Sequence, residues 1–148
     1  MNSSKVGDYN NSPRNIGFVK TSKNLKEPVI SDGPEEKGGF FTFGGQWQEL
    51  TNKGIKWLTK LAEGQNASRV KAVGFKNKIF ILFEAWTKDA YINTQYMTAD
   101  TSGNVVVPNT VIPYKIRLHK SDDIYATNHS VIVYAAAKGK ILNRYEFF

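Results

Sequence analysis

Two segments in the second half of the chain follow the same pattern. They span residues 70–83 and 122–135, and each contains a strand-like stretch, a short polar turn and an apolar stretch. In both segments a lysine-bearing turn and another aromatic stretch come next. Strands that recur at a fixed spacing indicate a repeat architecture, so this pattern constrains the fold more than any other feature.

The composition supports an all-β domain that buries its own core. At 148 residues, one domain is expected. The content of 41% apolar and 13% aromatic residues excludes global disorder, because that much apolar surface can offset the entropy lost on folding. Aromatic and β-branched residues suit a pleated, half-buried surface. We therefore predict antiparallel sheets built from blade-like repeats, as a partial propeller or a sandwich, preceded by an extended N-terminal arm.

Polar turn residues separate the expected strands. The turn at residues 100–103, Asp-Thr-Ser-Gly, is of the kind that joins antiparallel strands. Residues 79–83 and 131–137 are nearly continuous apolar runs, which predict strands covered on both faces. The expected strands span residues 40–43, 69–75, 78–86, 90–99, 104–113, 124–125, 131–137 and 141–148. Residues 54–61 fit both helical and strand spacing, and we favour a strand there.

The first 38 residues differ from the remainder, residues 39–148, which we expect to form the β-repeat domain. The clusters of Asn, Ser, Gly and Pro in residues 1–38 contain few apolar side chains that could be buried. One short apolar stretch stands out, with Ile16, Phe18 and Val19 as its apolar residues. Residues 1–38 are therefore either a flexible arm or a segment that docks onto a neighbour and adds a strand to an open sheet edge.

The two similar segments, together with residues 91–103, make the chain resemble β-propeller repeats over about residues 39–148. Ile79 and Val131 are 52 residues apart, close to the length of a four-stranded blade. No Trp-Asp dipeptide or kelch-type Gly-Gly pair indicates a particular propeller family. A closed propeller needs at least four blades, more than this chain supplies. The resemblance therefore implies either an open arrangement such as a sandwich or partial barrel, or closure between chains.

Charge and cysteine content limit the function classes. The chain has no cysteine, which removes disulfides, cysteine-based zinc sites and thiol catalysis, and which slightly favours a reducing compartment. No stretch is apolar over the ~20 residues needed to span a bilayer, and no signal peptide is visible. The net charge of +7 comes mainly from lysine rather than arginine. A nucleic-acid partner is therefore unlikely, because base and phosphate contacts favour the arginine fork.

A few charged residues are candidates for a site. Asp122 and Asp123 could hold a cation, but further oxygen ligands are missing, so we expect them to fix a turn and to pair with Arg117. Glu84 interrupts an apolar strand, and such a carboxylate either pairs with a Lys or Arg on the adjacent strand or lines a pocket. The two histidines, His119 and His129, lack a nucleophile nearby in the sequence, and we expect them to be exposed turn residues.

The aromatic residues are the best candidates for ligand contacts. Aromatic faces stack on sugar rings or bases, and neighbouring amides supply hydrogen bonds, although most aromatics in a β protein belong to its core. Together with the charged candidates, the predicted ligand-contacting residues are Trp47, Trp57, Glu84, Trp86, Tyr91, Arg117, Asp122 and Asp123.

The sequence contains no catalytic, metal-binding or nucleotide-binding motif, and we expect neither a metal nor a cofactor. We therefore predict a non-enzymatic structural or interaction protein that assembles with itself or with a larger partner through open sheet edges and its N-terminal arm. The alternative is a lectin that binds carbohydrate at aromatic stacking sites between blades. The compartment is left open by the sequence.

Overall fold

The computed structural model describes residues 14–21, 23, 36–41, 44–52, 54–136 and 142–148, with backbone pairing alone for the strands at 36–41 and 47–52. These residues form antiparallel sheets of two, three and four strands and contain no helix, which confirms the predicted all-β class. The chain divides into two compact units, residues 1–66 and 67–148.

The first unit contains two two-stranded sheets. Its strands are β1 (Gly17–Phe18), β2 (Glu36–Phe41), β3 (Trp47–Asn52) and β4 (Lys56–Trp57). β1 pairs with β4, and β2 pairs with β3. Gly17 is required at its position because a Cβ atom there would lie 2.9 Å from a methyl carbon of Ile55. The ambiguous stretch at residues 54–61 thus contains a short strand.

Polar side chains hold β1 next to β4. The Asn15 side-chain oxygen accepts hydrogen bonds from the Leu61 amide at 2.8 Å and from the Thr59 hydroxyl at 3.2 Å. Ile16 is buried here, within the chain's own first unit. The expected docking of Ile16, Phe18 and Val19 onto a neighbour stays a prediction. So does the arm boundary at residue 38, because residues 1–13 and 24–35 lie outside the described part.

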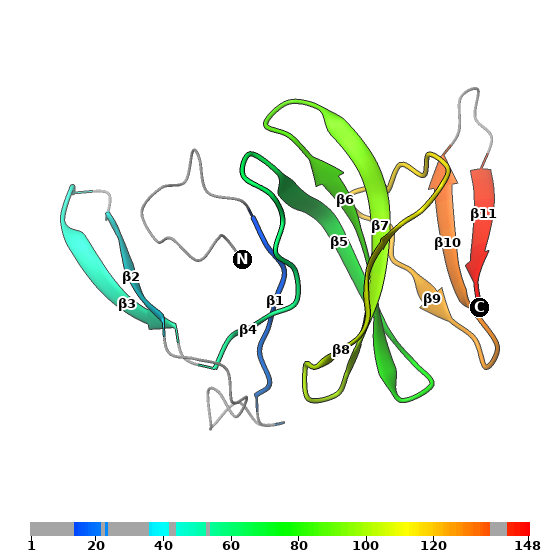
Figure 1. The fold of residues 1–148 in the computed structure, drawn as a ribbon, viewed down its shortest axis with the longest axis horizontal. Coiled ribbons are helices and arrows are strands. Elements are labelled where there is room, and N and C mark those ends of the chain that lie inside the picture. Colours follow the sequence, from blue (N-terminus) through cyan, green and yellow to red (C-terminus); the bar gives the residue numbers. More distant parts are fainter. Residues whose placement is uncertain (1–13, 22, 24–35, 42–43, 53, 137–141) are drawn as a thin grey trace. The chain divides into compact units, whose positions relative to one another are not determined.

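The second unit is built on a four-stranded sheet in which the strands follow one another in sequence order (Figure 1). They are β5 (Asn66–Phe75), β6 (Lys78–Trp86), β7 (Tyr91–Asp100) and β8 (Val105–Val111), which confirms the four strands expected here. Lys76 and Asn77 both have positive φ, 47° and 60°, as a two-residue hairpin turn requires. The Asp100 carboxylate accepts hydrogen bonds from the backbone amides of Ser102 and Asn104, which closes the predicted tight turn.

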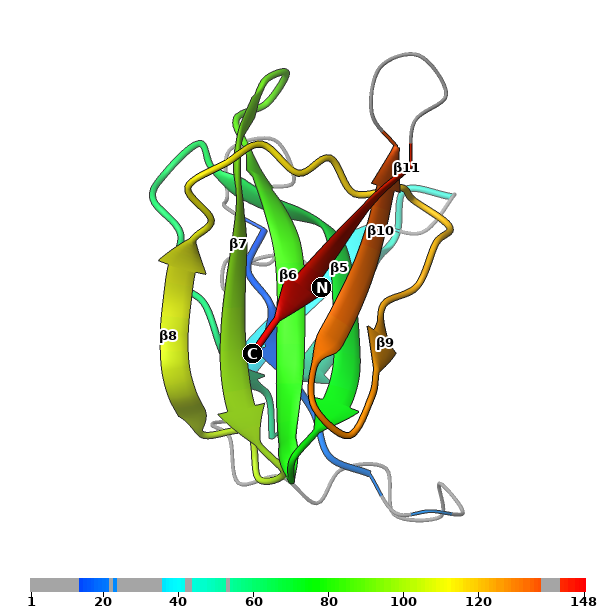
Figure 2. The same ribbon diagram turned by 90° about the vertical axis from the view of Figure 1, so that its right-hand side faces the viewer.

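A three-stranded sheet lies against this four-stranded sheet (Figure 2). It consists of β9 (Tyr125–Ala126), β10 (Val131–Ala136) and β11 (Leu142–Phe147), with β10 in the centre. One cluster of buried residues joins the two sheets and residues 112–124, which connect β8 to β9. Its members are Phe75, Phe80, Leu82, Ile112, Ile116, Leu118, Ile124, Val131, Val133 and Ala135.

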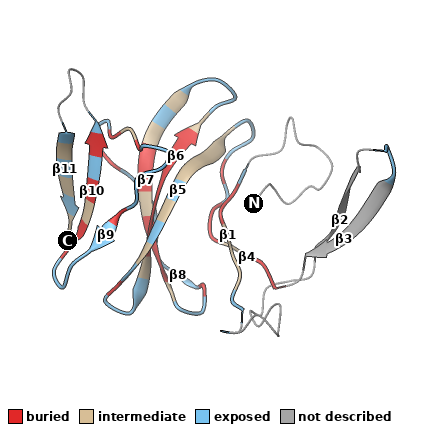
Figure 3. Ribbon diagram, turned by 180° about the vertical axis from the view of Figure 1, so that it is seen from behind, coloured by how far each residue is buried: buried red, intermediate tan, exposed pale blue. Residues whose placement is uncertain are grey.

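The two apolar runs differ in how far they are buried. β6 is buried over six consecutive residues, so both of its faces are covered as predicted. β10 instead alternates between buried and more exposed residues (Figure 3). Val131 and Val133 face the core, whereas Tyr134 is 38% exposed. The prediction that residues 131–137 are covered on both faces was therefore wrong for residues 131–136, because the described part of the chain packs against one side of this sheet.

Candidate binding site

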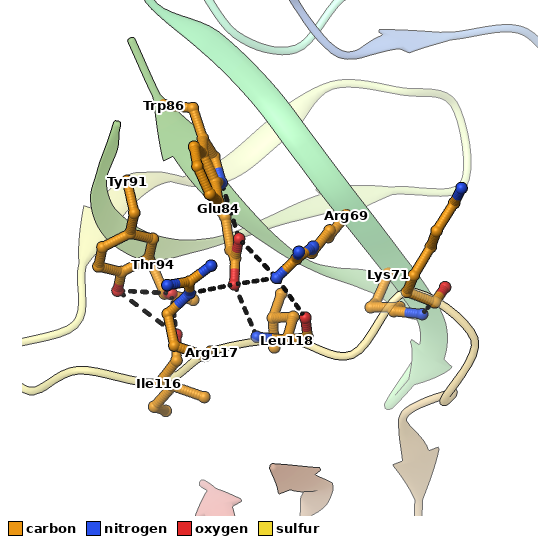
Figure 4. A network of polar contacts seen from close by, with 10 residues as sticks. Arg69, Lys71, Glu84, Trp86, Tyr91, Thr94, Ile116, Arg117 and Leu118 are labelled. Carbon is orange, nitrogen blue, oxygen red and sulfur yellow. Dashed lines mark hydrogen bonds and ion pairs between the residues drawn. The ribbon is translucent and has the colours of Figure 1, made fainter. Parts of the chain in front are cut away.

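The buried carboxylate of Glu84 is the centre of a polar cluster at the end of β6 (Figure 4). Its Oε1 accepts hydrogen bonds from the Leu118 amide at 2.7 Å and from Arg117 Nε at 3.2 Å. Its Oε2 accepts one from Trp86 Nε1 at 2.7 Å. The Arg69 guanidinium lies 3.3 Å from Oε2. Burying a charge is costly unless it is paired and hydrogen-bonded, and here both oxygens are satisfied.

Arg69, which contacts Glu84, has an unusual backbone conformation. It lies in β5 at a φ of 51°, a left-handed conformation that costs an L-residue about 1–2 kcal/mol. The guanidinium also donates a hydrogen bond to the Leu118 carbonyl oxygen at 2.9 Å. We infer that these charge-assisted contacts offset the cost of the backbone conformation.

The same cluster fastens the irregular residues 112–124 to the four-stranded sheet. The Thr94 hydroxyl, on β7, donates to the Ile116 carbonyl oxygen. The Tyr91 hydroxyl lies 3.0 Å from the Thr94 hydroxyl oxygen. Lys71, on β5, donates to the Lys120 carbonyl oxygen at 3.1 Å. Side chains of three strands thus provide the hydrogen bonds that backbone groups outside a sheet require.

Cationic and aromatic side chains alternate across the cluster. The Arg117 guanidinium carbon lies 4.6 Å from the Tyr91 ring centroid and 5.0 Å from the Trp86 ring centroid. Arg69 lies over Trp86 at 5.7 Å, and Lys115 lies over Tyr91 at 5.6 Å. Each such contact is worth about 0.5–1 kcal/mol at an exposed site. Arg117 is therefore held both by its ion pair and by two aromatic rings.

This geometry makes Glu84 a structural ion-pair partner. A general acid or base must exchange a proton with a substrate, but the two oxygens of Glu84 already accept hydrogen bonds from four groups within the chain. The structure confirms that Glu84 pairs with an arginine of the adjacent strand, β5. Among the described residues, no group of three His, Asp or Glu side chains is arranged to hold a metal ion.

An open pocket of about 390 Å³ lies beside the cluster. Its walls are the first residues of β7 and the first residues after β8. Tyr91 belongs to both the pocket and the cluster. The lining residues are Tyr91, Ile92, Asn93, Ile112, Pro113, Tyr114 and Lys115. The Tyr114 ring stacks on Tyr145 at a centroid distance of 5.8 Å, and Tyr114 is 51% exposed.

The structure brings together four of the predicted ligand-contacting residues: Glu84 and Trp86 on β6, Tyr91 on β7, and Arg117. Trp57 lies in β4 of the first unit, and Trp47 lies in β3, whose side chains are outside the described part. Asp122 and Asp123 are exposed, and neither takes part in the cluster.

The expected pairing of Arg117 with Asp122 or Asp123 was wrong. Arg117 pairs with Glu84, because residues 112–124 run along the sheet and present this side chain to the end of β6. Asp122 instead approaches His119, with 3.4 Å between its Oδ2 and the imidazole Nδ1, in a pair that is largely exposed.

The ligand-contacting residues predicted from the sequence did not include Arg69 of the cluster or Tyr114 and Lys115 of the pocket. These are three residues that the site depends on. A signal existed for one of them. Lys115 and Arg117 alternate with apolar residues between positions 114 and 118, a pattern that places both cations on one side of an extended chain. Arg69 gave no comparable signal, because its role depends on an unusual backbone angle.

Comparison with protein-family models, curated proteins and solved structures found no match to the chain. A helix long and apolar enough to cross a bilayer does not occur among the described residues. Any function must therefore be inferred from the geometry of the chain's own residues.

Proposed function

We propose that the chain is a non-enzymatic interaction protein that associates through the outer face of the β9–β10–β11 sheet. Cross-strand partners share a face, so the pairing register of the three strands defines this outer face. Its residues are Tyr125, Ile132, Tyr134, Ala136, Leu142, Arg144 and Glu146. The observation that carries the proposal is that β10 is nearly all apolar but is covered by the described residues on one side only.

The exposure of the outer face supports this proposal. Tyr125 is 58% exposed and Leu142 is 62% exposed. Burying apolar surface is worth about 25 cal/mol for each Å², so covering these side chains would favour association. The charges on this face, Arg144 and Glu146, form an ion pair 2.9 Å apart. The face therefore carries no uncompensated charge that would repel a second copy.

The open edges of the two sheets differ in their suitability for strand addition. β8 and β11 are both outermost strands, and no described strand pairs with their free edges. β8 contains Pro108, which lacks an N–H donor and so weakens pairing along that edge. β11 contains neither proline nor glycine. Its edge is the better site for another strand, including one from the N-terminal arm of a second chain.

The order of the four-stranded sheet supports a blade-like role for the second unit. β5 to β8 form a meander in which each strand pairs with the next, as strands do in a propeller blade. A stacked blade has both faces covered by its neighbours. We propose that a second copy of the chain, or a larger partner, covers the outer face of the final sheet in this way.

The native mass of the purified chain tests self-association. Light scattering on a sizing column should give a defined oligomer for the wild type and a smaller species for Tyr134→Lys, because a charge would be buried at the contact. Val106→Lys is the matched control: it adds the same charge to an exposed strand position on β8. A monomeric wild type would contradict self-association. The proposal would then hold only if the outer face binds a different protein.

The lectin alternative is favoured by one observation, the pocket beside the cluster. It offers the half-exposed ring of Tyr114 and the Asn93 amide, the combination that sugars bind. Trp86 and Tyr91 are poorer platforms than the sequence suggests, because cations already lie over both rings. A sugar would therefore stack on Tyr114.

A further inference from the structure

We propose that the pocket lined by Tyr91, Asn93, Tyr114 and Lys115 binds an acidic sugar, with the sugar ring against Tyr114 and its carboxylate facing Lys115. This inference deepens the lectin alternative and rests on it. It is independent of the proposed association through the outer face, whose residues do not line the pocket.

The volume of the pocket is sufficient for a small ring-shaped ligand. Its volume of about 390 Å³ lies within the usual range for small-molecule sites, about 300–1,000 Å³. Tyr114 is supported from one side by its stack on Tyr145, so its ring is held in place before any ligand arrives. A platform held in place in advance loses little conformational entropy on binding.

The charges around the pocket favour an anion. Among the described residues, Lys115 forms no ion pair that would offset its charge. The neighbouring carboxylate of Glu84 is fully buried and already compensated by two arginines. Arg117, two residues from Lys115, uses Nε for Glu84, and its side chain is 36% exposed. The pocket therefore lies in a positive field with no described carboxylate free to neutralise it.

The pairing of one lysine with an aromatic ring and an amide fits a sugar carboxylate better than a phosphate group. A phosphate site usually provides an arginine fork or a series of backbone amides from a glycine-rich loop. The pocket contains neither of these. A uronic acid carries one negative charge, which Lys115 can match, and has hydroxyl groups that the Asn93 amide can bind.

Nuclear magnetic resonance titration of the full ¹⁵N-labelled chain tests this inference. The two probes are methyl β-glucuronide and methyl β-glucoside, which differ only in the carboxylate. At constant ionic strength, the glucuronide should shift the backbone amides of Asn93, Tyr114 and Lys115 with a millimolar dissociation constant. The glucoside should bind at least about fivefold more weakly, because it lacks the charge.

Matched variants locate the charge partner. Lys115→Gln should reduce the affinity for the glucuronide to that of the glucoside, whereas Lys78→Gln should leave it unchanged. Lys78 is an exposed lysine at the opposite end of β6 from Trp86 and does not line the pocket. Both variants remove one positive charge, so a difference between them cannot arise from net charge alone. Tyr114→Ala should weaken both probes.

The other outcomes distinguish the preference for acidic sugars from the lectin alternative on which it rests. Equal binding of both probes, unaffected by Lys115→Gln, would overturn the preference for acidic sugars and keep the lectin alternative. Binding of neither probe would overturn the lectin alternative as well. Shifts produced equally by inorganic phosphate would show a general anion site and overturn the assignment to a sugar. None of these results bears on the native mass, which tests the proposed association.

Discussion

At the scale of single residues, Glu84 has the most demanding environment in the described part of the chain. It is a charged group without solvent exposure, and two arginines, an indole and a backbone amide compensate for its burial. The two arginines stay about one third exposed. Water therefore screens the charges of the two arginines but not the charge of Glu84. The loss of stability on mutation depends on which of these partners is replaced.

We predict that Glu84→Gln lowers the free energy of unfolding by about 2–3 kcal/mol. The amide removes the charge that both arginines face and presents an N–H group to donors. The loss should be smaller than for a fully buried pair, because the arginines keep contact with water. Urea unfolding followed by tryptophan fluorescence measures it. Glu63→Gln, the same change at an exposed position, should stay within about 0.5 kcal/mol of the wild type.

If both variants unfold at the same urea concentration, the ion pair contributes nothing to stability and the structural role assigned to Glu84 is wrong. The interruption of an apolar strand by Glu84 indicated either a pair with a Lys or Arg or a place in the lining of a pocket, and the structure shows the pair. Its partners were not predictable in the same way. Arg69 depends on a left-handed backbone angle, and Arg117 depends on the path of residues 112–124.

At the scale of elements, the carboxylate of Glu146 on β11 has a pKa below its ordinary value. The hydrogen bond from Ser130 lowers the pKa of Glu146, and the charge of Arg144 lowers it further. Because the pKa is lower in the folded state than in the unfolded state, the charged form stabilises the fold at neutral pH. This contribution is lost as the pH falls through the folded-state pKa.

We therefore predict that Glu146→Gln makes the stability of the second unit less dependent on pH under acidic conditions. At neutral pH the variant should be less stable than the wild type, and below the pKa of Glu146 the two should converge. Urea unfolding at a neutral and at a strongly acidic pH checks this. A constant difference between the two proteins at both pH values would show that the charge of Glu146 is not the cause.

The strands of the second unit were predictable because local residues mark their ends. Two residues with positive φ, Lys76 and Asn77, join β5 to β6, and a side-chain-capped turn at Asp100 joins β7 to β8. These signals act over a few neighbouring residues. The cover over β10 is different, because apolar residues show only that a surface prefers burial and do not say what buries it.

At the scale of the whole molecule, the net charge of +7 opposes association between copies, whereas burial of the apolar outer face favours it. We predict that the native mass of the assembled chain stays constant or rises slightly between about 0.05 and 0.5 M salt, because screening weakens the repulsion between basic copies. Light scattering at both concentrations measures this. A mass that falls with added salt would show that charge pairs, rather than the outer face, hold the copies together.

The sequence by itself determined the all-β class and the four strands from β5 to β8, and it identified Glu84 as a carboxylate that needs either a cationic partner or a pocket. Each of these follows from contacts between residues close in sequence or from the high cost of burying an unpaired charge. Only the tertiary structure decided that Arg69 and Arg117 are the partners, that Tyr114 and Lys115 line a pocket, and that β10 is covered on one side. These features depend on how residues 112–124 cross from one sheet to the other. Such a path is set by the packing of many distant side chains together, and no short stretch of sequence specifies it.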